Sequence, residues 1–453
     1  MYQEYKDSEA DEQRKSPWVP GLVEVKFRSA DDSGLRHFDF SKPLERTQCP
    51  ERWSPELSQI LTRSKLLTWR PSFPLRYSWS RESEEESRQF YSASGRDTLI
   101  TLRFPDDADV SKIAKELRSL PEVARANPVA KVAPPAIQEE LLGTSDQDSL
   151  HQWYAFRCNL PETLETVTGA GVTVAVIDWG FDVSHKDYRA NIELKKNIYN
   201  DDSDVSDGNT DHGTASMGLA GARLNNFGIV GFAPDSILWA IQAGHDGIVN
   251  HFDWAAGIDF VRSEPALGRK VIILEIQTLS GGNIECIEAI NQVIRDAIAA
   301  NIVVCVPAGN NMEADPSRDD DGHKIPVTCS VLVGATDFHI QDNFANSSMG
   351  ARVVVYAPGA RDNDLTCEAG GGHVLSFGGT SGAVAKVGGA VALILEANPS
   401  LTPVEVRDIL RHSTIPVLLE VDPPIGVLLD CQQAVSEARN TVTHHKVCAS
   451  VDH

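Results

Sequence analysis

Short apolar segments alternate with segments of helical periodicity from about residue 150 onward. The apolar segments have strand length, and they predict strands at 172–177, 236–240, 270–276, 302–306, 331–335 and 353–357. Helical patterns lie between and after them, at 213–222, 253–263, 284–300, 381–397 and 402–411. Such alternation is typical of an α/β fold with a mostly parallel central sheet and helices on both faces. We therefore predict an α/β domain over residues 150–440, followed by a tail at 441–453.

The N-terminal part of the chain follows a different pattern. Residues 21–28 alternate apolar and polar side chains, and a strand–helix–strand pattern follows over residues 98–132. We predict a small α+β domain at 21–135, with an irregular insertion at 29–97 that is rich in Ser, Pro, Arg and Glu. Two polar segments complete the predicted organisation, a mobile N-terminus at 1–20 and an exposed acidic linker at 136–149.

Composition excludes several classes of function. The 453 residues include 41 Lys and Arg against 64 Asp and Glu, which gives a formal net charge of -23. A nucleic-acid-binding protein should carry a basic surface, and an anionic membrane should repel this chain, so we expect neither partner. No apolar run reaches the roughly 20 residues that a membrane-spanning helix needs.

The N-terminal segment and the cysteines favour a cytoplasmic location. The charged N-terminus lacks the apolar core of a secretory signal. Eight Cys are too few for a disulfide scaffold. Four of them lie in or beside apolar segments and are expected to be buried free thiols, as in a reducing compartment: Cys286, Cys305, Cys329 and Cys367.

Four polar residues stand where predicted strands end or predicted helices begin. Asp178 and Asn310 follow strands, whereas His212 and Ser381 stand at helix starts. Active sites of α/β proteins lie at the carboxyl ends of the strands, and a helix N-terminus favours negative charge. Taken singly, each residue has a structural explanation: a turn Asp, a turn Asn, a packed His or a capping Ser.

The order and spacing of the four motifs change this balance. Asp178, His212 and Ser381 are separated by 34 and 169 residues, in the order Asp, His, Ser. The motifs AVIDWG, HGT, AGN and GTSGA resemble those of the subtilase family of serine proteases, over roughly residues 150–440. The resemblance implies a three-layer subtilisin-like fold, a triad of Asp178, His212 and Ser381, and an oxyanion hole with Asn310.

The resemblance also places a substrate cleft. The segment LEIQ at 274–277 stands where the family usually has a Ser-Leu-Gly edge strand that pairs with substrate backbone. The residues expected to bind substrate are Glu275, Ile276, Gln277, Ala308 and Gly309. The carboxyl of Glu275 and the amide of Gln277 would make the cleft narrower and more polar, unless Glu275 points into a hydrogen-bonded corner away from substrate.

Other positions depart from the family pattern. Trp179 follows the triad Asp, where the family usually has Ser or Thr. Ala385 and Lys386 stand where the family usually has Pro, often followed by His. These residues would crowd the triad and alter the helix that follows Ser381.

Calcium is common in the family, and Asp187 stands at the position of one calcium ligand. The partner loop LNNFGIVG is one residue shorter than the family's loop, which argues against that site. The acidic runs at 201–208 and 315–322 are expected to be solvated loops, and the tail HHKVC at 444–448 is not expected to hold a metal. We therefore expect no metal and no required cofactor.

The segment LRSLPEVARANPVAKV resembles the C-terminal part of the inhibitory propeptide of subtilases. The resemblance implies that the N-terminal domain helps folding and lays its C-terminal end in the active site, as an intramolecular inhibitor. A self-cleavage bond would then lie between about Ala133 and Leu150. The alternative is an unrelated accessory domain.

The function implied by these motifs is hydrolysis of peptide bonds in peptide or protein substrates, through an acyl-enzyme, by an intracellular processing protease. Two alternatives stay open. A peptide ligase or cyclase would pass the same acyl group to an amine, and Trp179 and Ala385 motivate it. A binding protein that keeps an inactive protease fold is the other.

Overall fold

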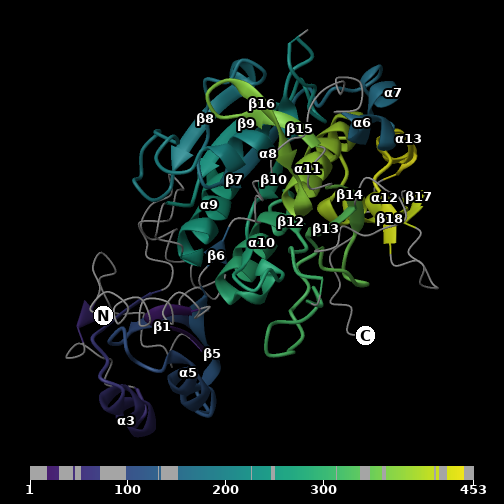
Figure 1. Ribbon diagram of the computed structural model, residues 1–453. Coiled ribbons are helices and arrows are strands. Elements are labelled where there is room, and N and C mark those ends of the chain that lie inside the picture. The colour runs from purple at the N-terminus through teal and green to yellow at the C-terminus, as the bar shows by residue number, and fades with distance from the viewer. Residues whose placement is uncertain are drawn as a thin grey trace, which may run out of the picture. The chain divides into compact units, whose positions relative to one another are not determined.

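The computed structural model describes residues 18–29, 44–45, 53–71, 98–130, 132–133, 152–225, 227–245, 250–312, 314–336, 347–359, 364–412, 415–417 and 426–442 (Figure 1). They belong to an N-terminal unit, Met1–Lys131 with Asn250–Phe252, and a C-terminal unit, Val132–Val249 with Asp253–His453. The predicted linker at 136–149, the segment HHKVC and most of the predicted N-terminus and tail lie outside the described residues.

A five-stranded antiparallel sheet forms the N-terminal unit, in the order β2-β3-β4-β1-β5. The strands are β1 (Trp18–Phe27), β2 (Leu44–Glu45), β3 (Thr68–Pro71), β4 (Leu99–Arg103) and β5 (Val123–Ala130). Helices α3 (Pro55–Arg63) and α5 (Val110–Arg118) share one apolar core with the sheet. That core includes Val25 of β1, Leu57 of α3 and Leu117 of α5.

Part of the insertion predicted to be irregular is regularly folded. Helix α3 and strands β2 and β3 all lie within 29–97. Ser54 caps α3 by accepting a hydrogen bond from the backbone N–H of Leu57 at 3.0 Å. The rings of Trp53 and Trp69 pack with their centroids 5.1 Å apart. The prediction of an irregular segment was wrong because these elements are short, with nine, two and four residues, so the composition of the whole segment outweighed their local patterns.

A nine-stranded sheet forms the centre of the C-terminal unit, in the order β17-β18-β14-β13-β12-β10-β7-β9-β8. All neighbours are parallel except the pair β17–β18. The strands are β7 (Val172–Asp178), β8 (Ile192–Asn197), β9 (Ile237–Gln242), β10 (Arg269–Leu274), β12 (Val303–Pro307), β13 (Val331–Thr336), β14 (Val355–Pro358), β17 (Ile415–Val417) and β18 (Gly426–Leu428). The mostly parallel sheet agrees with the prediction.

Helices cover both faces of this sheet (Figure 1). The helices of the unit are α6 (Trp153–Arg157), α7 (Leu160–Leu164), α8 (Asp211–Gly221), α9 (His251–Ser263), α10 (Glu288–Ala299), α11 (Gly379–Ala397), α12 (Pro403–His412) and α13 (Cys431–Asn440). Val174 and Val176 of β7 share a core cluster with α8 and α11, whereas Ile177 faces Gly257 of α9. Alternate side chains of one strand thus serve opposite helix layers, and the predicted three-layer architecture is confirmed.

Helix α11 is the central helix of the unit. Every residue from Gly379 to Leu395 is buried. Among the described helices it alone is long and apolar enough to cross a membrane, and 89% of that stretch is buried inside the protein. Such burial is what a core helix shows.

The cysteines partly follow the prediction. Cys286, Cys305 and Cys367 are free, and the last two are fully buried. Cys329 is disulfide-bonded, so the expectation of a free thiol there is wrong. An apolar neighbourhood does not distinguish the two states, because free and bridged cysteines are both among the most buried residues.

Candidate active site

Three predicted site residues meet at the carboxyl edge of the sheet. Asp178 is the last residue of β7, His212 lies in the first turn of α8 and Ser381 in the first turn of α11. All three are at most 1% exposed. The start of α8 comes so close to the loop after β7 that a Cβ at Gly213 would overlap the carbonyl oxygen of Gly180.

Hydrogen bonds join the three side chains in a chain. His212 Nδ1 lies 2.8 Å from Asp178 Oδ2 and 3.0 Å from Oδ1. Its Nε2 lies 3.1 Å from Ser381 Oγ. Because a carboxylate only accepts, Nδ1 carries the proton and Nε2 is free to accept the hydroxyl proton of the serine. This arrangement can generate a serine nucleophile.

Neighbouring groups hold the histidine and the aspartate in place. The backbone N–H of Trp179 donates to Asp178 Oδ1 at 2.7 Å. The ring of Phe377 meets the imidazole of His212 edge-on, with centroids 5.1 Å apart. The side chain of Trp179 packs against Gly244 and Trp254. It therefore crowds these two residues, whereas we expected it to crowd Asp178 and His212.

Asn310, three residues beyond β12, lies next to the start of α11. Its Oδ1 accepts hydrogen bonds from the backbone N–H of Thr380 at 3.0 Å and from the Thr380 hydroxyl at 2.9 Å. These two donors determine which side of the amide is the oxygen, and they leave Nδ2 as a donor beside the residue that precedes Ser381. The turn needs glycine at 309, where φ is +106° and a Cβ would overlap the carbonyl oxygen of Gly281.

The side chains predicted to bind substrate are buried. Ile276 and Ala308 are 0% exposed, and Gln277 is 6% exposed. Gln277 Oε1 accepts a hydrogen bond from the backbone N–H of Asn310 at 2.8 Å, so this side chain supports the asparagine. The backbone of β11 (Gln277–Thr278) instead pairs antiparallel with β6 (Val132–Ala133). It is therefore the backbone of this edge that binds an extended strand.

Glu275 lies beside Asp178 and His212 and is fully buried. Its neighbour Leu274 pairs with Ile177, so Glu275 and Asp178 are adjacent across the sheet. Its carboxyl lies within 4.8 Å of the polar atoms of Asp178 and His212, and the residue is 0% exposed. The expectation that Glu275 makes the cleft more polar is wrong, because the register of β10 turns it inward.

Burial raises the pKa of Glu275 to about 8. The positive form of His212 opposes this rise, Asp178 adds to it, and the hydroxyls of Ser216 and Ser381 oppose it. Glu275 is therefore mainly protonated at neutral pH. The sequence signal for this second acidic group was a Glu directly after a buried strand, but its proximity to Asp178 depends on strand order and register.

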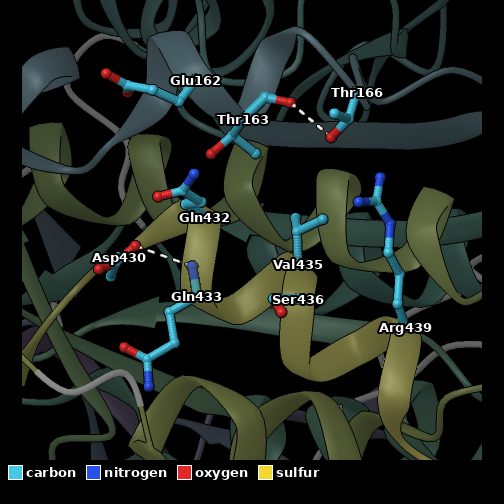
Figure 2. A pocket seen from close by; sticks show the side chains of 9 residues that line it. All are labelled: Glu162, Thr163, Thr166, Asp430, Gln432, Gln433, Val435, Ser436 and Arg439. Atoms are coloured by element: carbon cyan, nitrogen blue, oxygen red, sulfur yellow. Dashed lines mark hydrogen bonds between the residues drawn. The ribbon is translucent and has the colours of Figure 1, made fainter.

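A polar pocket of roughly 580 Å³ lies elsewhere, between α7 and α13. Figure 2 shows Thr163 and Thr166 on one side of it and Gln433 and Arg439 on the other. Gln433 donates its backbone N–H to Asp430, which caps α13. No predicted site residue lines this pocket, and we assign it no role in substrate binding.

The acidic runs make local turn contacts. Asp204 accepts hydrogen bonds from the backbone and hydroxyl of Ser206, and Asp315 does the same with Ser317. These are the side-chain turns that Asp favours in loops, and they do not by themselves define a metal site.

Comparison with known proteins places these features in a family. The sequence model of the subtilase family, peptidase S8, matches residues 169–445, more than half of the chain. An intracellular serine protease of Paenibacillus polymyxa is 32% identical over 268 residues, which cover 57% of this chain and 78% of that protein. Subtilisin of Bacillus pumilus is 31% identical over 252 residues, which cover 54% of this chain and 84% of that subtilisin.

The fold is also similar to a solved structure. The crystal structure of fervidolysin from Fervidobacterium pennivorans, a keratinolytic enzyme related to subtilisin, matches with a TM-score of 0.61 at 17% identity. The match covers 93% of this chain and 62% of that chain. It confirms the predicted subtilisin-like fold.

Proposed function

The chain belongs to the subtilase family of serine-type endopeptidases, and from this premise we propose that Asp178, His212 and Ser381 are its catalytic triad. Ser381 Oγ attacks the scissile carbonyl carbon while His212 Nε2 takes the hydroxyl proton. Asp178 orients the imidazole through Nδ1 and stabilises its charged form. His212 then protonates the leaving amine, and water hydrolyses the acyl-enzyme by the reverse of these steps.

Asn310 supplies one donor of the oxyanion hole in this proposal. The tetrahedral intermediate carries a negative oxygen, which pre-oriented N–H groups stabilise. Asn310 Nδ2 and the backbone N–H of Ser381 are the two donors. The first is oriented by the hydrogen bonds from Thr380 to Asn310 Oδ1, and the second lies at the N-terminus of α11, where the helix dipole favours an anion.

The observation that carries the proposal is the unbroken contact from Asp178 through His212 to Ser381. A fluorophosphonate probe tests it, because this probe reacts only with an activated serine. We expect one label on the peptide that contains Ser381, lost in Ser381→Ala and His212→Ala and kept in Ser436→Ala. Absence of labelling in folded protein, with the N-terminal segment displaced, would favour the inactive binding protein. Weighing the products of a peptide ester incubated with an amine separates hydrolysis from ligation.

We further propose that the segment ending in β6 occupies part of the substrate-binding strand. The pairs Gln277–Ala133 and Thr278–Val132 are antiparallel and lie on the edge next to Asn310. A substrate that pairs with the same edge must displace β6. The N-terminal region would therefore act as an intramolecular inhibitor, and a peptide that spans residues 121–133 should compete with substrate.

We propose an intracellular processing role for the enzyme. The Paenibacillus polymyxa relative is named an intracellular serine protease, and four buried cysteines are free thiols: Cys158, Cys305, Cys367 and Cys431. The disulfide at Cys329 points the other way, because disulfides are rare in reducing compartments. Fractionation of the native host tests the location, and mature protein found mainly in the medium would reject it.

A further inference from the structure

Asp187 stands where the family commonly has a calcium ligand, but its surroundings do not fit calcium. It is fully buried, and its Oδ2 lies 2.7 Å from His373 Nε2 and 3.6 Å from Cys367 Sγ. Calcium takes six to eight oxygen ligands. The loop that would complete the calcium site instead places Gly228 so close that a Cβ there would overlap both Asp187 and His373.

The donors around Asp187 come from two short stretches of chain. His185 and Asp187 follow β7, two residues apart. Cys367 and His373 stand directly opposite each other in the hairpin of β15 (Asp364–Glu368) and β16 (Gly372–Phe377). The ligand atoms of His185, Cys367 and His373 all lie within 4.8 Å of one another.

We propose that Asp187, Cys367 and His373, with His185 as the fourth ligand, bind a zinc ion. Thiolate, imidazole and carboxylate are the ligands of zinc in proteins, and four of them in a tetrahedron form a structural site. Bond lengths of about 2.0–2.3 Å put such ligand atoms roughly 3.3–3.8 Å apart. The ligand atoms of His185, Cys367 and His373, which lie within 4.8 Å of one another, need at most a small contraction, whereas Asp187 Oδ2 and His373 Nε2, now 2.7 Å apart, must separate slightly.

One observation besides the clustering points to a missing ligand. Asp187 Oδ1 is buried and has no hydrogen-bond partner among the described residues. A buried, unsatisfied carboxylate oxygen is costly, and a cation bound to it would remove that cost. Asp187 Oδ2, by contrast, accepts from the backbone N–H of Ile229 at 3.1 Å as well as from His373 and Cys367.

Binding requires defined changes at the ligands. Without metal, the Cys367 thiol donates to Asp187; zinc replaces that proton, which leaves to solvent, and a Zn–S bond forms. The neutral His373 ring moves its proton from Nε2 to Nδ1. His185 gives up one of its two backbone contacts, to the carbonyl oxygen of Gly372 at 2.8 Å or from the N–H of Asp187 at 3.2 Å.

Cobalt substitution tests the site directly. Full-length Ser381→Ala protein, which cannot digest itself in the proposed mechanism, is stripped with a chelator, dialysed and titrated with Co²⁺. We expect one equivalent to produce a near-ultraviolet sulfur-to-cobalt charge-transfer band and the visible bands of tetrahedral cobalt. Zn²⁺ should abolish both, Ca²⁺ in large excess should not, and Zn²⁺ should raise the Tm.

Two matched cysteine variants test whether the sulfur atom that binds the metal is that of Cys367. Cys367→Ser should lose the charge-transfer band and the zinc-dependent Tm increase, whereas Cys305→Ser, at an equally buried free cysteine of β12, should keep both. If Cys367→Ser does not fold, zinc-edge X-ray absorption of the parent protein decides, with one sulfur at about 2.3 Å expected. No band, a band kept in Cys367→Ser, an all-oxygen zinc shell, or displacement by Ca²⁺ would overturn the proposal. Fluorophosphonate labelling of Ser381 is independent of every one of these results.

Discussion

At the scale of single residues, Asn310 offers a direct test of the proposed oxyanion hole. Asn310→Ala removes the Nδ2 donor, and kcat should fall about 10²- to 10³-fold with little change in KM, because the donor acts mainly on the transition state. Asn311→Ala is the control, since the neighbouring amide donates to the carbonyl oxygen of Ser280 instead. Steady-state kinetics on one peptide substrate measures both, and an equal loss in the two variants would contradict the assignment.

Glu275 should make stability depend on pH in an unusual direction. Its pKa is raised from an ordinary 4.5 to about 8. Between these pH values the folded protein holds a proton that the unfolded chain has lost, so stability falls as pH rises. As the pH rises through this window, the free energy of unfolding of Glu275→Gln should therefore increase relative to that of its parent, by at most about 1.4 kcal/mol per pH unit. Urea unfolding at several pH values, in a Ser381→Ala background, measures the difference.

Glu285 provides a control of opposite sign. This glutamate is also fully buried. Burial acts to raise its pKa, but Arg352 and the hydroxyls of Thr328 and Ser330 outweigh that effect and lower it. The contribution of ionised Glu285 to folding stability is complete above the pKa that this group has in the unfolded chain, and it is lost as the pH falls. The loss of unfolding free energy in Glu285→Gln, relative to its parent, should hence become smaller as the pH falls. If the difference in unfolding free energy from the parent changed with pH in the same direction for both variants, the two pKa directions would be contradicted.

A site residue could be predicted from the sequence where it lies in a short motif, but not where its position depends on which distant strands pair. Asp178, His212 and Ser381 could be predicted because each sits in a short motif at the end of an element. The inward position of Glu275 stood only as an alternative, because it follows from the pairing of Leu274 with Ile177. The cluster at Asp187 was missed for the same reason, since Cys367 and His373 become neighbours only through the hairpin register.

At the scale of elements, the ion pair between Lys386 and Asp364 joins α11 to β15. Lys386 Nζ lies 2.5 Å from Asp364 Oδ2, 2.8 Å from the carbonyl oxygen of Pro358 and 4.4 Å from the ring centre of Tyr154, and both charged side chains are 0% exposed. Lys386→Met keeps the volume but removes the charged partner of the buried Asp364 carboxylate. The free energy of unfolding should drop by about 3–5 kcal/mol.

The double variant Lys386→Met, Asp364→Leu separates the ion pair from packing. Because both charges are then absent, much of the lost stability should return. Urea unfolding in a Ser381→Ala background gives the values. If the single variant stays within 1 kcal/mol of its parent, the pair is not the link between α11 and β15 that its burial suggests.

Helices and strands that contain a long apolar run could be predicted from the sequence, whereas elements with only short or interrupted apolar runs could not. The strands around 172–177 and 302–306 and the helix around 381–397 agree with the structure to within a few residues. Strand β8 was missed because Ile192–Asn197 is an edge strand whose two exposed side chains, Glu193 and Lys195, are charged and whose apolar positions are only half-buried. Ala385 and Lys386 suggested a helix geometry different from the family's after Ser381; α11 runs from Gly379 to Ala397, and Asp364 pairs with the buried Lys386.

At the scale of the whole molecule, the sequence indicated two parts but not the folded content of the first. The apolar pattern at 98–132 was clear, whereas α3 and β3 are short elements inside a long segment rich in Ser, Pro, Arg and Glu. The inhibitory role of this region came from resemblance, and its support here is the short strand β6 on the edge at β11.

This arrangement leads to a prediction about maturation. Residues Val132–Ala133 pair with the edge at β11, and the first helix of the C-terminal unit among the described residues begins at Trp153. If the segment lies in the cleft as a substrate would, the enzyme should cut its own chain between about Ala133 and Leu150. Purified wild-type protein should then lose this N-terminal part over time, and intact mass and N-terminal sequencing locate the bond.

The Ser381→Ala protein is the necessary control for this cleavage. It should stay at full length alone, because no nucleophile is present, and a trace of mature enzyme should cut it at the same bond. Processing of purified Ser381→Ala alone would assign the cut to another protease, and a wild-type chain that labels with fluorophosphonate yet keeps its full mass would show that β6 is not positioned for cleavage. Since a bound strand must leave before substrate can enter, peptidase activity should rise in step with the processed fraction. An enzyme that is fully active before processing would argue that β6 exchanges freely and is no inhibitor.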